Sequence, residues 1–78
     1  MKVNLIGLKV VQFKDDNGRE VNGTNLYCTF ADENVTGLRA EKFFVKSEVT
    51  LPKELKQNDV LDIQFNMKGK VEAISKAN

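Results

Sequence analysis

The sequence predicts a small all-β domain, a five-stranded barrel, on three observations. Apolar and polar residues alternate over five short stretches, which is the period of half-buried strands. Polar segments containing Gly, Asn or Pro separate these stretches and predict turns. A glycine, Gly7, interrupts the longest stretch, and barrels need such a device to turn a corner. The 78 residues form one domain, residues 1–78, of ordinary globular composition.

The first strand is expected over residues 2–13. Val3 and Leu5 have one parity, whereas Leu8 and Val10 have the other, and Gly7 lies between the two pairs. A glycine inside a strand often marks a bulge or a sharp bend. We therefore expect one long strand that bends at this glycine and changes which residues point inward.

Residues 20–30 form the second strand, joined to the first by a tight turn in which Asn17 and Gly18 supply positive φ angles. Alternating apolar residues predict its buried face, which places Tyr27 on the opposite side. These buried residues are Leu26, Cys28 and Phe30. A polar loop then leads to a third strand over residues 38–47.

The third strand carries the main functional signal and allows two interpretations. Side chains alternate along a strand, so Lys42, Phe44 and Lys46 share one face, and Phe43 and Val45 share the other. If Phe43 and Val45 alone form the core, or an irregularity interrupts the strand before them, the outer face displays an aromatic ring between two cations. If the faces are reversed, Phe44 belongs to the core and the signal is lost.

The segment after the third strand contains Pro52, the only proline. Proline suits the first position of a helix, so residues 51–56 predict a short helical turn between the third and fourth strands. Leu51 and Leu55 would then face the barrel and cover one of its ends.

The last two strands are expected over residues 60–67 and 71–74, with a tight turn at residues 68–70 between them. The fourth has the cleanest alternation, with inward residues Leu61, Ile63, Phe65 and Met67. Five strands with a helical turn after the third fit a Greek-key barrel of the OB-fold type. An SH3-like barrel, which differs in its strand pairing, is the alternative.

The composition argues against catalysis and metal binding. The chain has no His and one Cys, so the usual general base and the usual zinc ligands are missing. We expect no enzymatic activity, no catalytic residues and no cofactor, and we expect Cys28 to be a buried core residue. A charged-apolar leader and a long apolar run are also missing, which favours a cytoplasmic protein without a membrane span.

A binding surface is the remaining functional candidate. Twelve Lys and Arg against eleven Asp and Glu leave a net charge of +1, so nucleic acid would be bound through the arrangement of charges. In an OB-fold, the exposed faces of the second and third strands form the ligand platform. Tyr27 and Phe44 would stack on bases there. Five cations would contact phosphates: Lys42, Lys46, Arg39, Lys9 and Arg19.

The pattern resembles small OB-fold single-stranded-DNA-binding proteins of phages and mobile elements, including the filamentous-phage gene V type. The matching parts are the short length, the Asn17-Gly18 hairpin, the strand with Tyr27, and two runs near the end. These runs are Asn58-Asp59-Val60-Leu61-Asp62-Ile63 and Gly69-Lys70-Val71. The resemblance implies sequence-independent binding of single strands by a homodimer. We expect the strand to be DNA rather than RNA, and we expect a role in DNA replication. The alternative is a protein–protein interaction module that binds no nucleic acid.

Overall fold

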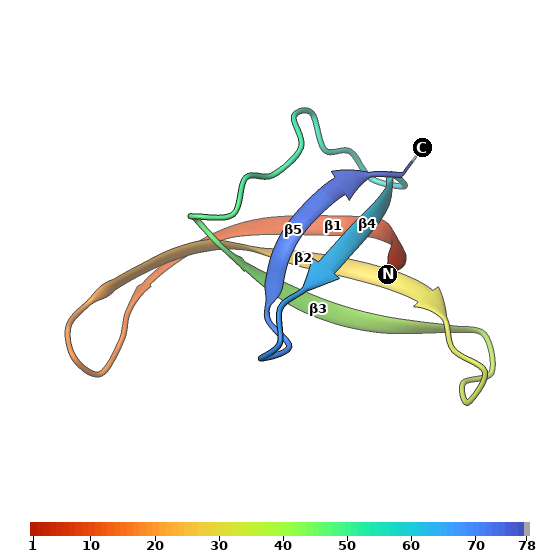
Figure 1. The fold of residues 1–78 in the computed structure, drawn as a ribbon, viewed down its shortest axis with the longest axis horizontal. Helices are drawn as coiled ribbons and strands as arrows, with labels where there is room; N and C mark the ends of the chain where they lie inside the picture. The colour runs from red at the N-terminus through yellow and green to blue at the C-terminus, as the bar shows by residue number, and fades with distance from the viewer. Residues whose placement is uncertain (78) are drawn as a thin grey trace.

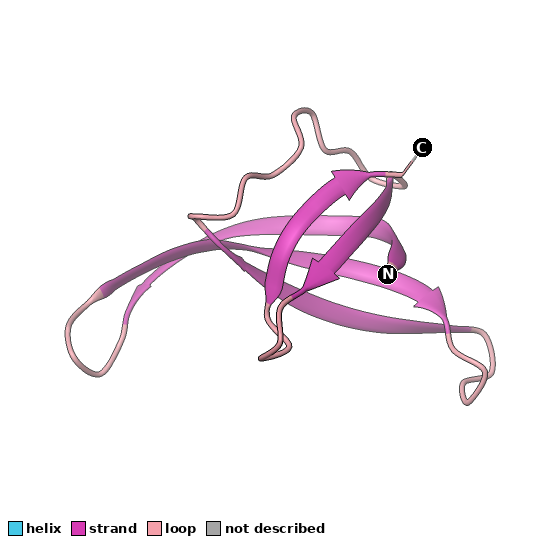
Figure 2. Ribbon diagram, in the orientation of Figure 1, coloured by secondary structure: helices cyan, strands magenta, loops and turns pink. Residues whose placement is uncertain are grey.

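The computed structural model describes residues 1–77 as one antiparallel sheet of five strands (Figures 1 and 2). The strands are β1 (Lys2–Lys14), β2 (Glu20–Ala31), β3 (Leu38–Lys46), β4 (Val60–Phe65) and β5 (Val71–Lys76). Their order across the sheet is β3-β2-β1-β4-β5. The sheet curls so that the β4–β5 hairpin crosses over β1, β2 and β3 (Figure 1). The predicted all-β class with five strands is confirmed, but the sheet is not closed into a barrel.

Gly7 lies at the predicted irregularity in β1. The register of β1 against β2 shifts between Leu5 and Gly7, which is the signature of a β-bulge. The shift lets Leu8 pair with Leu26 on the face that Leu5 already occupies. That face carries the core, whose fully or nearly buried apolar residues are Val3, Leu5, Leu26, Cys28, Val45, Leu61, Ile63 and Ile74.

The predicted helical turn is wrong, because the segment between β3 and β4 contains no helix. Glu54 has a φ of 58° and Asn58 a φ of 76°, and these left-handed angles break a right-handed helix. Leu51 and Leu55 are nevertheless half-buried and pack against the core, as expected. In residues 1–77 the structure has no helix that could cross a bilayer.

The register of β3 decides between the two interpretations of its faces. Residues 38–46 pair with β2 without any irregularity. Val45 is buried in the core and Phe43 packs against it, so Phe44 lies on the outer face. A phenyl ring between two lysines therefore faces away from the core. Cys28 is buried as predicted, and burial raises the pKa of its thiol to about 11.

Two predictions about strand ends need correction. β4 ends at Phe65, so Met67 lies fully exposed in the following turn rather than on the inward face. β5 extends to Lys76, two residues past its predicted end. The far ends of β1 and β2 also continue past the core as a projecting hairpin (Figure 1). Val10 is 75% exposed there, because no other element covers it.

Candidate nucleic-acid interface

The outer faces of β1, β2 and β3 form a platform built from transverse rows of paired residues. One row is Gly7, Tyr27 and Lys42; the next is Lys9, Asn25 and Phe44; the third is Val11, Gly23 and Lys46. We call this surface the platform and define it by Lys9, Tyr27, Lys42, Phe44 and Lys46. Tyr27 and Lys42 are direct cross-strand neighbours, so their side chains leave the sheet from adjacent positions.

Each aromatic ring of the platform lies over a glycine of the neighbouring strand. A Cβ atom at Gly23 would come within 2.5 Å of Cζ of Phe44, so this ring covers the bare backbone. A Cβ atom at Gly7 would lie 3.8 Å from Cδ2 of Tyr27. Aromatic covering of strand glycines stabilises a sheet and fixes the ring against it. Tyr27 is still 37% exposed, so part of its surface is free for a ligand.

The platform carries cations without carboxylates. In β1, β2 and β3, the acidic residues are Glu20 and Glu41, and the strand register places both on the inner face. Lys9, Lys42 and Lys46 lie on the outer face with the two rings. The platform is therefore locally basic although the chain as a whole is nearly neutral.

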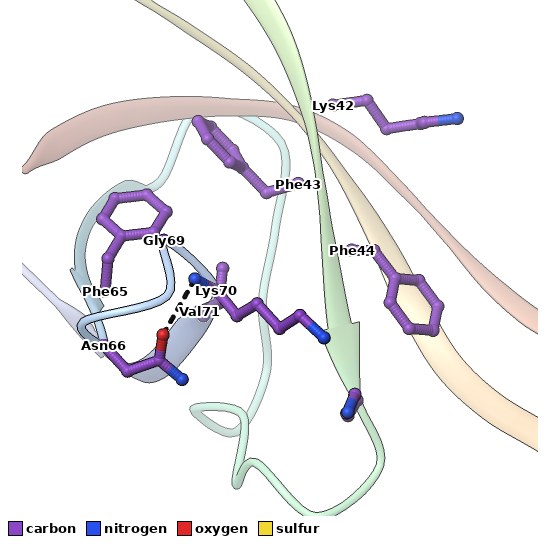
Figure 3. Close-up of a pocket in the computed structure, with 9 residues that line it drawn as sticks. Lys42, Phe43, Phe44, Phe65, Asn66, Gly69, Lys70 and Val71 are labelled. Carbon is purple, nitrogen blue, oxygen red and sulfur yellow. Dashed lines mark hydrogen bonds between the residues drawn. The ribbon is translucent and has the colours of Figure 1, made fainter.

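A groove borders the platform at the edge of the sheet, between β3 and the β4–β5 turn (Figure 3). Its volume is about 400 Å³. We call it the edge groove; its lining residues are Lys42, Phe43, Phe44, Lys46, Phe65, Asn66, Gly69, Lys70 and Val71. None of these nine residues is acidic. The rings of Phe43 and Phe65 meet across the groove with their centroids 5.8 Å apart.

The turn that forms the far side of the edge groove is organised by Asn66. Its Oδ1 accepts hydrogen bonds from the backbone N–H groups of Lys68, at 2.9 Å, and Lys70, at 3.0 Å. Gly69 has the positive φ, 78°, that closes the turn. Figure 3 shows the Lys70 side chain extending from this turn towards β3.

The β1–β2 turn has the same construction, which sequence reasoning did not recognise. Asp15 Oδ1 accepts the N–H groups of Asn17 and Arg19, both at 2.9 Å, and Gly18 has a φ of 78°. Positive φ is thus confirmed for Gly18 but not for Asn17. Both turns are an Asx residue followed three positions later by Gly. The tight turn predicted at residues 68–70 is thus confirmed, and the shared spacing is the signal that would have revealed its construction.

The structure separates Arg39 from the other predicted site residues. Arg39 lies on the inner face of β3, where it forms ion pairs with Asp32, at 3.1 Å, and Glu41, at 2.6 Å. Its guanidinium also stacks over Phe30. A hydrogen bond from the Asn34 N–H, followed by the Arg39 contact, holds the pKa of Asp32 below its usual value.

The remaining predicted residues divide between the platform and the β1–β2 turn. Tyr27, Phe44, Lys42, Lys46 and Lys9 lie together on the platform. Arg19 lies in the turn at the tip of the projecting hairpin, outside this group. Sequence reasoning missed Phe65, Asn66 and Lys70, which face the same ligand space from the opposite side of the groove.

No protein-family model, curated protein or solved structure matches this chain. Function is therefore inferred from the platform and the edge groove.

Proposed function

We propose that the protein is a non-enzymatic, sequence-independent single-stranded-DNA-binding protein with an OB-type strand arrangement. The arrangement is supported by β1, which pairs with both β2 and β4. β3 and β5 extend the sheet on either side, so within residues 1–77 only a hydrogen-bonded ladder between these two strands is missing from a Greek-key barrel. This pairing favours the OB-type arrangement over the SH3-like alternative.

The observation that carries the proposal is the composition of the platform. Tyr27 and Phe44 offer flat surfaces for bases, and each stacked base contributes about 1–3 kcal/mol whatever its identity. Lys9, Lys42 and Lys46 provide charge for phosphates on a face without carboxylates. Arg39 is left out of the proposed site because Asp32 and Glu41 already neutralise it.

The biological setting is proposed from the sequence resemblance to phage and mobile-element proteins. A chain of +1 net charge binds through local arrangement, so we expect modest affinity and strong salt dependence. We propose a cytoplasmic protein of phage or mobile-element type, with a role in DNA replication. We also propose that two copies associate as a homodimer.

The direct test is fluorescence anisotropy with a labelled oligothymidine at low and at high salt. We expect binding at low salt that weakens as salt rises. Tyr27→Ala should weaken binding about tenfold, the loss of one stacked base. Phe44→Leu should act similarly, because leucine still covers Gly23 but has no flat face. Absence of binding by the unaltered protein at low salt would refute the proposal.

Circular dichroism of the two variants controls for folding. A variant that binds poorly but melts near the temperature of the parent protein assigns its ring to the ligand. A variant that has lost its fold assigns that ring to packing. Unaltered binding by both folded variants would exclude the platform as the site.

The projecting hairpin supports a second candidate function, protein binding by self-association. Leu8 is 43% exposed and Val10 is 75% exposed, and both lie on the inner face of the sheet, away from the platform. Lys14 and Glu20, which are paired at the tip of that face, give it opposite charges that a second copy could match.

Val10→Asp tests this contact without altering the platform. If two copies associate through the hairpin, sedimentation should show a dimer for the parent protein and a monomer for the variant, because a buried unpaired carboxylate is costly. A monomeric parent protein, or a variant that remains dimeric, would remove the hairpin as the dimer contact.

A further inference from the structure

The edge groove adjoins the platform, and three residues, Lys42, Phe44 and Lys46, border both. A single-stranded nucleic acid that runs from the platform across β3 therefore reaches the groove. We propose that the edge groove binds a nucleotide of the same single strand and that Asn66 makes it selective for the phosphate. This inference rests on the proposed function, because it extends the path of the same ligand.

Cations line the groove from two directions. Lys42 and Lys46 line it from β3, and Lys70 lines it from the β4–β5 turn. Figure 3 shows Lys70 extending towards β3, whereas the Lys42 side chain points away from Lys70. In residues 1–77 none of these three lysines forms an ion pair. Ammonium groups that reach a small groove from two elements favour an anion there. A phosphate of the strand backbone is the anion that the platform would deliver.

The side chain of Asn66 offers an N–H donor to the groove, where an aspartate in the same turn position would carry a negative charge. Its Oδ1 is occupied by the two backbone N–H groups of the turn, which also fixes the orientation of the amide. Its Nδ2 donates no hydrogen bond within residues 1–77 and is free for a ligand oxygen. Asp15 builds the same turn with a carboxylate, so the turn geometry does not require an amide. The amide at position 66 therefore keeps negative charge out of the groove.

Two aromatic residues that line the groove provide a contact for the sugar or base of the nucleotide. Phe43 and Phe65 pack together there, and Phe65 remains 38% exposed. An exposed ring beside a phosphate site can contact a sugar or a base. The groove therefore suits a nucleotide better than inorganic phosphate alone.

The test uses four variants of the full chain and a labelled oligothymidine. Asn66→Asp should retain the fold, because aspartate already supports the equivalent turn at position 15. It should weaken binding about tenfold at low salt, because a donor becomes a negative charge facing a phosphate. Lys70→Gln should weaken binding and lower the salt slope by about one.

Two matched controls lie in the same turns but outside the groove. Lys68→Gln removes a cation from the Asn66 turn, and Lys68 does not line the groove. Asp15→Asn replaces a carboxylate with an amide in the β1–β2 turn, which is the reverse of Asn66→Asp. At low salt, Asp15→Asn should bind at least as tightly as the parent protein. Lys68→Gln should bind only slightly more weakly, because it removes one positive charge outside the groove.

The outcomes separate this inference from the proposed function. Weaker binding by Asn66→Asp and Lys70→Gln, with both controls near the parent protein, supports the groove as part of the site. If the parent protein binds and the Tyr27→Ala variant binds weakly, but Asn66→Asp and Lys70→Gln bind normally, the groove inference is wrong and the platform stands. If the two lysine variants weaken binding equally, only general charge is at work and the groove inference is wrong. If the parent protein does not bind, both proposals fall.

Discussion

β3 carries cations along its whole length, but its two ends treat them differently. Near the start of the strand, Arg39 is held by Asp32 and Glu41 on the inner face. Towards the end, Lys42 and Lys46 lie on the outer face, where β1, β2 and β3 carry no carboxylate. The first arrangement stabilises a loop, whereas the second leaves positive charge available to a ligand.

This difference shows why net charge is a poor guide to the function of this chain. Eleven acidic residues nearly cancel twelve basic ones, so net charge alone argues against an anionic partner. The strand register nevertheless keeps Glu20 and Glu41 away from the platform. Charge is therefore separated across the thickness of the sheet, and a ligand near the platform experiences the local field.

The largest expected effect comes from disturbing the packing of the Phe44 ring over Gly23. A Cβ atom at Gly23 would lie 2.5 Å from both the Phe44 ring and the carbonyl oxygen of Val45. Gly23→Ala should therefore destabilise the fold by about 1–3 kcal/mol, since the backbone must shift. Gly7→Ala is the matched control, because its nearest contact is an ordinary 3.8 Å to Tyr27. Urea unfolding of both variants would show this contrast, and equal stabilities would contradict the tight contact.

A smaller effect separates the two ends of β3 in binding. Lys46→Gln should weaken oligothymidine binding severalfold and reduce the salt slope by about one, as expected for one lost phosphate contact. Arg39→Gln removes the same formal charge but should leave affinity nearly unchanged, because that guanidinium is already paired. Anisotropy titrations over a salt series would measure both. Equal losses for the two variants would mean that charge acts without regard to the face it occupies.

The smallest expected effect is a pH dependence of stability that comes from Asp32, the partner of Arg39. The folded-state pKa of Asp32 is lowered, first by the hydrogen bond from the Asn34 N–H and then by Arg39. Its stabilising contribution is therefore present above the ordinary pKa of 3.8 and is lost as the pH falls through the lower folded value. Thermal melts between neutral and acidic pH should show Asp32→Asn losing less stability on acidification than the parent protein. A parallel decline in both proteins would exclude Asp32 as a contributor.

Much of the fold could be predicted because local patterns and tertiary structure agree. Alternation in β2 and β4 correctly assigned Leu26, Cys28, Leu61 and Ile63 to the core. Gly7 correctly marked the irregularity in β1. The helical turn failed because Pro52 favours a helix start only locally, whereas Glu54 and Asn58 adopt left-handed angles that the sequence pattern does not reveal.

The candidate site was only half predictable, for a topological reason. Tyr27 and Lys42 could be expected to be neighbours because adjacent strands pair. The approach of Phe65, Asn66 and Lys70 to β3 depends on the curl of the whole sheet, which no local pattern records. Parity places Arg39 on the face opposite Lys42 and beside Glu41, a signal that the prediction of Arg39 as a phosphate contact overlooked. Its second partner, Asp32, comes from a loop and could not be read from parity.

The side of the sheet between β3 and β5 is held without a ladder of main-chain hydrogen bonds in residues 1–77. Within residues 1–77 these strands share no paired register, so separating them sacrifices no main-chain hydrogen bond. Side chains connect this side instead: Val45 of β3 and Ile74 of β5 belong to one buried core, and Phe43 contacts Phe65 at the end of β4. The curvature of the sheet on this side therefore depends on side-chain packing, and a substitution in that packing would loosen it without breaking a strand ladder.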